Sequence, residues 1–218
     1  MQYQLKKSRK RKSVAIKIKA GQVFVYAPEQ ICERWLHNWV ESKSDWIKSK
    51  LALKVIPESP RPLETGIVQV FGETFTIQRG ESTTSVIDFD NKRVLLKAVK
   101  NEWRELVTLL SETLNDYVDM VIARYQPDIQ ARFETLKIRV YKSRWGSFSS
   151  KGVLAFNTLL IGAPKWVIDY VVVHELCHFH VMAHNSAFWR LVTKHYGHDH
   201  KMARRYLRDH GRDLMIEH

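Results

Sequence analysis

The stretch Tyr170-Val171-Val172-Val173-His174-Glu175-Leu176-Cys177-His178 decides what the rest of the chain has to build. Its apolar first half predicts a buried helix, on which His174 and His178, four residues apart, share one face. Two imidazoles placed in this way can bind one metal ion, and zinc accepts them readily. Glu175 lies about 100° around the helix, where its carboxylate can miss the ion yet reach a zinc-bound water. The pattern is H-E-x-x-H, in which the glutamate serves as general base.

A catalytic zinc ion needs a third protein ligand and an open coordination position. Spacing leaves the choice open among the histidines that follow the motif, namely His180, His184, His195, His198 and His200. His180 would point away if the helix continued, whereas a chain that bends near Ala183 could bring His184 back. The competing interpretation is an amphipathic helix with two surface histidines, because ten histidines in the chain make accidental spacing more frequent.

The C-terminal half alternates between strands and helices around the motif. Periodicity and turn residues predict a helix at 102–125 closed by Pro127, strands at 136–140 and 152–160 with a loop at Gly146, and helices at 165–183, 186–195 and 198–210. The N-terminal part is richer in strands. It is expected to contain strands at 13–19 and 23–26 with a turn at Gly21-Gln22, a Trp-rich helix at 31–53, a loop at Pro57, Pro60 and Pro62, and a small antiparallel sheet at 66–97.

These elements predict an α+β protein with a soft boundary. Residues 1–97 form a β-rich N-terminal region with one Trp-rich helix, and residues 98–218 form the part that carries the motif. The tryptophan stripe of that helix is interpreted as core packing and not as a ligand site.

The chain is strongly basic, with a formal net charge of +12 and a pI near 9.7. A basic run spans residues 6–12, and Lys10, Arg11 and Lys12 are the candidates for contacting nucleic-acid phosphates. A solvated basic surface is the competing interpretation. The hydrophobic fraction of 44% is ordinary for a globular protein.

Cysteine content and hydropathy bear on the compartment. The two cysteines, Cys32 and Cys177, are too few for a secreted disulfide scaffold. No apolar run follows the basic start, so no secretory signal is expected. The most apolar stretch, residues 159–173, is too short and too polar to span a bilayer. We therefore expect a cytoplasmic protein without a membrane segment.

The C-terminal half resembles the YgjP-like family of metal-dependent hydrolases, relatives of the SprT-like zincins. The matching segments are Lys142-Ser143-Arg144-Trp145-Gly146-Ser147, Asn157-Thr158-Leu159-Leu160, Ala163-Pro164, the motif at 170–178, and His184 through Trp189. A weaker resemblance covers the N-terminal part. The chain departs from the family pattern at Phe148, where a cysteine is usual, and at Ala183 and Asn185, which flank the third histidine.

The resemblance implies a zincin-like metallopeptidase domain that holds one zinc ion per chain. Its ligands would be His174, His178 and His184, and Glu175 would be the base. We expect a zinc-dependent hydrolase acting on peptides or proteins, with Asn157 contacting the substrate and the strand that begins at Val153 pairing with it. Two rivals stay open. One is a nucleic-acid-associated protein whose metal site supports DNA or RNA binding, and the other is a module with a purely structural zinc ion.

Overall fold

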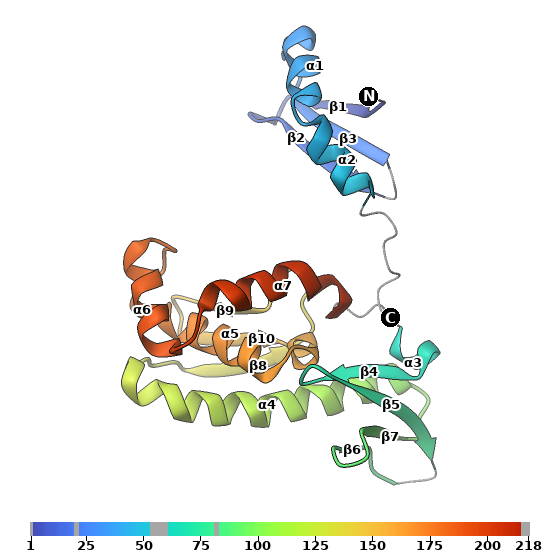
Figure 1. The fold of residues 1–218 in the computed structure, drawn as a ribbon, viewed down its shortest axis with the longest axis vertical. Coiled ribbons are helices and arrows are strands. Elements are labelled where there is room, and N and C mark those ends of the chain that lie inside the picture. The colour runs from blue at the N-terminus through green and yellow to red at the C-terminus, as the bar shows by residue number, and fades with distance from the viewer. Residues whose placement is uncertain (1, 20–21, 53–60, 81–82, 215–218) are drawn as a thin grey trace. The chain divides into compact units, whose positions relative to one another are not determined.

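A computed structural model describes residues 2–19, 22–52, 61–80 and 83–214 (Figure 1). The chain divides into two compact units, residues 1–57 and 58–218. This division differs from the boundary that the sequence predicted near residue 97. The sheet that precedes residue 97 is part of the second unit, because its Val70 and Leu96 belong to the same core as the long helix that follows it.

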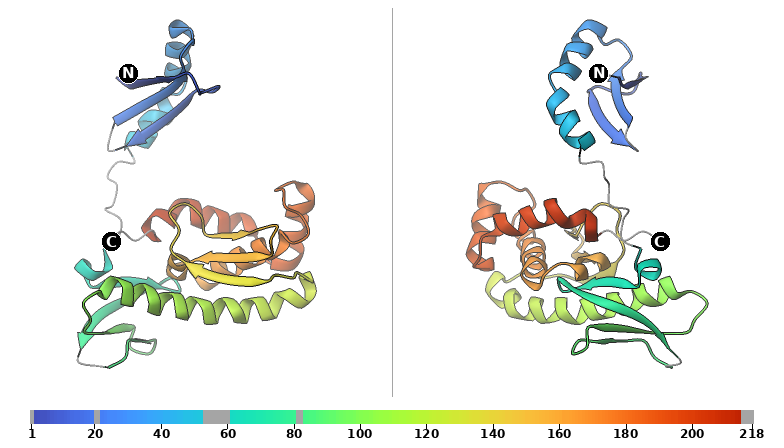
Figure 2. Two further views of the ribbon diagram at one scale, coloured as in Figure 1. Left: turned by 180° about the vertical axis from the view of Figure 1, so that it is seen from behind. Right: turned by 45° about the vertical axis from the view of Figure 1, so that its right-hand side comes forward.

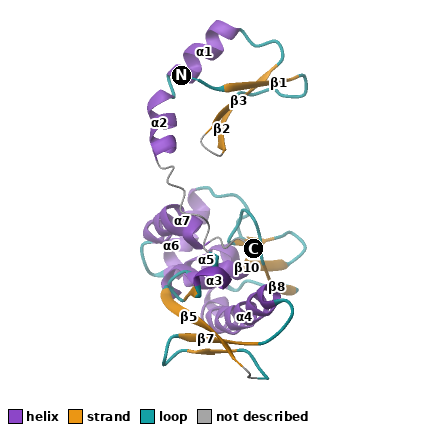
Figure 3. Ribbon diagram, turned by 90° about the vertical axis from the view of Figure 1, so that its right-hand side faces the viewer, coloured by secondary structure: helices purple, strands orange, loops and turns teal. Residues whose placement is uncertain are grey.

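The first unit is a three-stranded sheet with two helices on one face (Figure 3). Its elements are β1 (Gln4–Ser8), β2 (Ala15–Lys19), β3 (Gln22–Pro28), α1 (Glu33–Glu41) and α2 (Ser44–Ala52). Every second residue of β3 is buried and packs against apolar residues of the helices; this core is Val23, Val25, Ala27, Leu36, Val40 and Ile47. The single helix expected at 31–53 is two helices, because the chain turns at Ser42 and Lys43.

The basic run near the N-terminus is only partly a solvated arm. Residues Lys6, Lys7 and Ser8 belong to β1, which pairs in parallel with β3. Lys10, Arg11 and Lys12 follow in the turn and loop before β2. Charged side chains are common on an edge strand such as β1, because they discourage pairing with other chains. The predicted turn residue Gly21 and the predicted loop at Pro57 and Pro60 lie outside the described residues.

The second unit contains the remaining elements. These are α3 (Pro62–Thr65), β4 (Ile67–Val70), β5 (Glu73–Gly80), β6 (Val86–Asp88), β7 (Arg93–Lys97), α4 (Glu102–Ile129), β8 (Thr135–Arg139), β9 (Gly146–Phe148), β10 (Val153–Asn157), the 3₁₀ helix η1 (Thr158–Gly162), α5 (Lys165–Cys177), α6 (Ser186–Tyr196) and α7 (His200–Leu214). Pro62 of the predicted loop thus begins a short helix. The two sheets have the strand orders β4-β5-β7-β6 and β8-β10-β9.

The four-stranded sheet is mixed and not wholly antiparallel as the sequence predicted. β4 and β6 are antiparallel to their neighbours, but β5 and β7 pair in parallel. The parallel pair arises because β6 does not pair with β5. β6 pairs with the other side of β7 and is antiparallel to it, so β7 runs in the same direction as β5.

Helix α4 continues past Pro127, which the sequence analysis placed at its end. Pro127 sits in the last turn, and the helix ends at Ile129. Gln130 closes it in the left-handed conformation, with φ 56°, and its backbone N–H donates to the Gln126 carbonyl at 2.7 Å. A proline this near the end removes one helical hydrogen bond without breaking the helix.

The core of the second unit is built around α5. Figures 1 and 2 show α5 between α4 and α7, and it also contacts α6 and the edge strand β9. Apolar residues of α4 face it, as the periodicity predicted, and those fully buried include Leu106, Leu110, Leu114, Val118 and Val121. Because α5 is packed on several sides, the surrounding elements hold the two histidines and the glutamate of the motif in fixed positions.

Candidate metal centre

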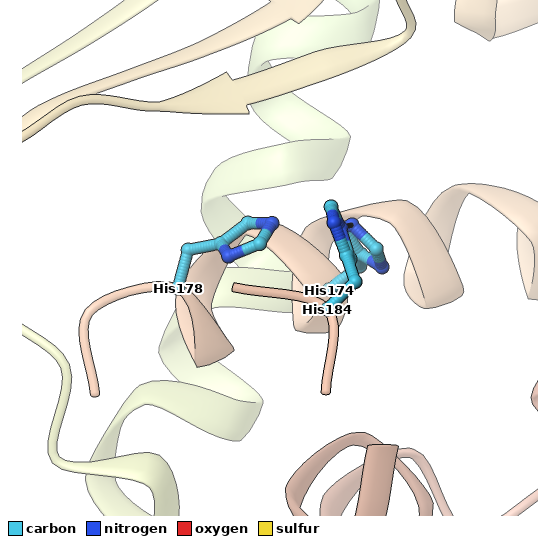
Figure 4. Close-up of side chains that lie close together, drawn as sticks. All are labelled: His174, His178 and His184. Carbon is cyan, nitrogen blue, oxygen red and sulfur yellow. Dashed lines mark hydrogen bonds between the residues drawn. The ribbon is translucent and has the colours of Figure 1, made fainter. Parts of the chain in front are cut away.

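Helix α5 and the chain just after it bring three histidines together. His174 lies on the last turn of α5, and His178 occupies its C-terminal cap position. The helix ends at Cys177 and not near Ala183 as predicted. This earlier end lets the chain turn back, so that His184 reaches the other two (Figure 4).

The three imidazoles converge on one point. One ring nitrogen from each lies within 4.8 Å of the others, and the Nε2 atoms of His174 and His184 are 3.0 Å apart. Two nitrogens bound to one zinc ion in a tetrahedron are separated by about 3.3 Å. One pair of nitrogens is thus close to this spacing, and the three histidines together could hold a metal ion.

Hydrogen bonds orient two of these rings. Nδ1 of His178 lies 3.0 Å from the Val181 carbonyl, which can only accept, so this nitrogen carries the proton and Nε2 keeps its lone pair. Nδ1 of His174 lies 3.2 Å from the Tyr170 hydroxyl. Partners of this kind fix the tautomer and the ring orientation in histidine metal sites.

The environment keeps His174 neutral. Burial lowers the pKa of His174 to about 3, and the neighbouring His178 and His184 act in the same direction. Burial also lowers the pKa of His178, although its hydrogen bond to Val181 opposes this. Neutral imidazoles carry the lone pairs that a cation requires.

Aromatic side chains of α6 pack against the histidine cluster. The Phe188 ring stacks on His178 with centroids 4.5 Å apart. The Trp189 indole N–H donates to the His184 carbonyl at 3.1 Å, and its ring stacks on that of His184. Asn185 caps α6 by accepting from the Phe188 N–H at 3.1 Å. The helix start thus sets the position of both rings that contact the histidines.

Glu175 lies beside this cluster in a nearly closed environment. Its side chain is buried, which raises the pKa of the carboxyl to about 8, whereas the Phe148 backbone N–H and the charge of Arg144 act to lower it. A divalent cation on the neighbouring imidazoles would favour the carboxylate further. Gly146 approaches so closely that a Cβ there would lie 2.7 Å from Cγ and Oε1 of Glu175.

A cavity of about 260 Å³ connects the cluster to α7. It is lined by residues of β9, α5 and α7 and by Trp145 just before β9; they include Gly146, Tyr170, His174, Glu175 and Arg204. The guanidinium of Arg204 lies 4.4 Å from the Trp189 ring centroid. The cavity therefore combines a carboxyl group, a candidate metal ligand and a permanent positive charge.

The sequence matches the YgjP-like metallopeptidase domain over residues 12–210. The chain belongs to the YgjP-like metallopeptidase family. It has the mixed α+β architecture expected of it, and a group of three histidines that could bind a metal.

Two solved structures are similar to parts of this YgjP-like chain. The metallopeptidase zymogen abylysin of Pyrococcus abyssi is 21% identical and has a TM-score of 0.39, over 45% of this chain and 99% of that one. The zymogen jannalysin of Methanocaldococcus jannaschii is 16% identical and has a TM-score of 0.38, over 42% of this chain and 94% of that one. The search of curated proteins found no match.

The other histidines considered from the sequence of this YgjP-like protein have different surroundings. His180 Nε2 lies 2.6 Å from the Ile129 carbonyl, and His200 Nδ1 lies 3.2 Å from the Thr193 hydroxyl. His195 and His198 are likewise outside the group of three. Spacing alone could not choose among these residues, because the choice depends on where α5 ends.

The substrate contacts expected at Val153 and Asn157 are corrected by the structure. Strand β10 is paired on both sides, with β8 and with β9, so it has no free edge for a peptide. Asn157 is fully buried, and its amide donates to the carbonyls of Tyr141 and Arg144, both at 2.9 Å. It holds the loop before β9 in place.

Several residues around the site escaped the sequence analysis as functional candidates. Tyr170 precedes His174 by one helical turn, so its spacing could have indicated the contact. Arg204 and the free edge of β9 carry no local signal, because their positions depend on tertiary packing. No described helix is long and apolar enough to cross a membrane. The cytoplasmic location stays a prediction.

Proposed function

We propose that this chain is a zinc-dependent peptidase in which His174, His178 and His184 hold one zinc ion and Glu175 is the general base. The observation that carries the proposal is the convergence of three imidazoles beside a buried carboxyl group. Among the described residues the group contains three potential ligands, which leaves a coordination position for water or substrate. A structural zinc site would instead be closed by a fourth protein ligand.

The residues of the cavity divide the chemistry among them. When bound, zinc supplies Lewis acidity for the attacked carbonyl and for the attacking water. Glu175 accepts a proton from that water and later donates it to the leaving amine. Arg204 favours the negative charge that develops on the carbonyl oxygen. Tyr170 keeps His174 in the orientation required of a ligand.

The free edge of β9 is the natural place for an extended substrate. Trp145 and Ser149 make their hydrogen bonds toward β10, at 2.8 and 3.0 Å, so the backbone of Gly146 and Phe148 faces the other edge. That edge adjoins Glu175, since the Phe148 N–H bonds its carboxylate. A peptide added to this edge as a further strand would pass the cavity and bond the Gly146 backbone and the Phe148 carbonyl, because the Phe148 N–H is already bonded to Glu175.

Metal content and peptide cleavage, measured on the same preparations, test the proposal. The wild type, purified without a histidine tag, should contain about one zinc ion per chain by plasma mass spectrometry. Glu175→Gln should keep the zinc and lose about 10²- to 10⁴-fold in cleavage of a peptide library. His184→Ala should lose both.

The control is His195→Ala, which removes a histidine outside the cluster and should change neither quantity. Full activity in Glu175→Gln, or a wild type that takes up no zinc, would refute the proposal. Unfolding on chelation together with an indifferent Glu175→Gln would instead support the structural-zinc alternative.

A further inference from the structure

The sheet of the first unit has one face that its own helices leave open. Val23, Val25 and Ala27 of β3 point toward α1 and α2 and are buried. Because side chains alternate along a strand, Phe24 and Tyr26 point to the opposite face, where both are half-buried. Figure 3 shows α1 and α2 on one side of the three strands.

Cationic side chains from the two neighbouring strands gather around these rings. The register places Lys6 of β1 opposite Tyr26, and Lys17 of β2 opposite Phe24. The Lys6 ammonium lies 5.0 Å from the Phe24 centroid, and the Lys17 ammonium lies 5.6 Å from that of Tyr26. The Arg11 guanidinium, from the basic run at residues 6–12, lies 5.3 Å from the Tyr26 ring centroid.

The charges on this face are not neutralised by the first unit itself. Lys7 and Arg9 pair with Glu33 and Glu29, but the described residues give Lys6, Arg11 and Lys17 no carboxylate partner. Residues 1–57 hold thirteen Lys and Arg against four Asp and Glu, which makes +9 of the chain's formal +12. A face with this excess charge attracts a polyanion.

We propose that the open face of β1-β3-β2 binds single-stranded nucleic acid, with bases stacked on Phe24 and Tyr26 and phosphates held by Lys6, Arg11 and Lys17. Two rings in a row on a sheet offer stacking surfaces to unpaired bases, as in other sheet-based readers of single strands. A duplex keeps its bases stacked inside and could use the cations alone. Lipid headgroups and acidic peptides could also use the cations, but lipid headgroups have no planar base to stack on the rings.

The test is fluorescence anisotropy of the full-length chain with labelled oligo-U, oligo-dT and a duplex of equal length, each about 12 nucleotides long. The single strands should bind at least about tenfold more tightly than the duplex. Tyr26→Leu and Phe24→Leu, which keep apolar bulk, should each weaken binding about tenfold through lost stacking.

A matched pair of charge variants separates this face from general basicity. Lys6→Gln with Lys17→Gln should weaken binding and reduce the salt slope by about 1.4. Lys43→Gln with Lys48→Gln, which removes the same charge from the helical side, should change affinity less than about twofold. Both pairs are surface changes, so they remain informative if a ring variant fails to fold.

Three outcomes would overturn the proposal. One is equal binding of duplex, heparin and single strand with no effect of Tyr26→Leu, which indicates a nonspecific basic surface. Another is binding to anionic lipid vesicles without oligonucleotide binding. The third is equal loss in the two lysine pairs, which places the contact elsewhere.

Discussion

Each of the two units contains a three-stranded sheet of the same topology. The two sheets differ in which part is accessible, a face in the first unit and an edge in the second. In both, the strand that comes last in sequence is central, with one parallel and one antiparallel neighbour: β1-β3-β2 in the first unit and β8-β10-β9 in the second. Strand β3 alternates between buried and half-buried residues. Strand β10 is buried at four consecutive positions, Leu154 through Asn157.

This difference in pattern decides where polar chemistry can occur. An alternating central strand leaves one face to solvent, so its polar and aromatic residues become a surface. A strand that is buried on both faces leaves only the edge of the sheet accessible. In the second unit one such edge is β9, next to Glu175, where burial raises the pKa of the carboxyl group. The comparison predicts that a substitution can destabilise one unit without destabilising the other.

The largest expected effect is on core packing in the second unit. Leu110 is fully buried on α4, so Leu110→Ala should lower the free energy of unfolding of residues 58–218 by about 2–5 kcal/mol. In a urea titration that uses peptide cleavage as the readout, activity should be lost at a lower urea concentration than in the wild type. In a titration that uses oligonucleotide binding as the readout, the midpoint of unfolding should not move.

Leu36→Ala, at a fully buried position of the first unit, is the reciprocal change. It should abolish oligonucleotide binding at lower urea and leave cleavage unaffected. A common shift of both midpoints in either variant would mean that the two units unfold together and that the comparison fails.

The next largest effect concerns the approach of β9 to Glu175. Gly146→Ala puts a methyl group 2.7 Å from Cγ and Oε1 of Glu175, so the carboxylate has to move. A displacement of this size should lower kcat/KM about 100-fold. Zinc content should stay unchanged, since the three heavy atoms nearest to the added methyl group all belong to Glu175.

Ser147→Ala, the neighbouring position on the same strand, is the control and should retain activity. Wild-type kinetics in Gly146→Ala would show that the position of Glu175 does not limit the reaction.

The sequence was informative wherever a local pattern set the structure. The spacing of His174 and His178 and the apolar residues before them predicted a buried helix with a two-histidine face, and α5 has both. The alternation of β3 and the periodicity of α4 were equally readable. These features depend on contacts between residues that are close in sequence.

Features that depend on distant contacts were missed or misplaced. β9 was expected to be a loop, since three residues around Gly146 become a strand only by pairing with β10 and packing on Glu175. The choice of His184 over His200 came from the resemblance and not from spacing. It depends on α5 ending at Cys177, which no proline or glycine marks.

A smaller effect is expected from removing the hydrogen bond between Trp189 and the His184 carbonyl. Trp189→Phe keeps an aromatic ring but removes the indole N–H that donates to the His184 carbonyl at 3.1 Å. Zinc affinity, measured by competition with a chromophoric chelator, should fall about tenfold. Trp166→Phe is the matched control, because Trp166 lies against Tyr206 and away from the histidines. Equal losses in both variants would assign the effect to general destabilisation.

The smallest effect distinguishes the two units by the sign of a pH dependence. Burial raises the pKa of Asp169 above its ordinary 3.8, although the Tyr117 hydroxyl, which donates at 2.7 Å, and Arg124 oppose this. The folded state therefore binds this proton more tightly than the unfolded state, and the stability contribution of Asp169 falls as pH rises from 3.8 through the raised value. Asp169→Asn lacks this dependence, so the wild type should lose stability relative to it as the pH rises from 3.8 through the raised pKa.

Glu33 in the first unit should behave in the opposite way. Its hydrogen bond to Lys7, at 2.6 Å, lowers its pKa below 4.5, so its contribution is present above 4.5 and is lost as the pH falls through the lowered value. Relative to Glu33→Gln, the wild type should therefore gain stability with rising pH, and solvent screening keeps this gain small. Unfolding curves of both pairs at several pH values measure the two slopes. Slopes of the same sign would contradict the inference that Asp169 is desolvated in the second unit and Glu33 is solvated in the first.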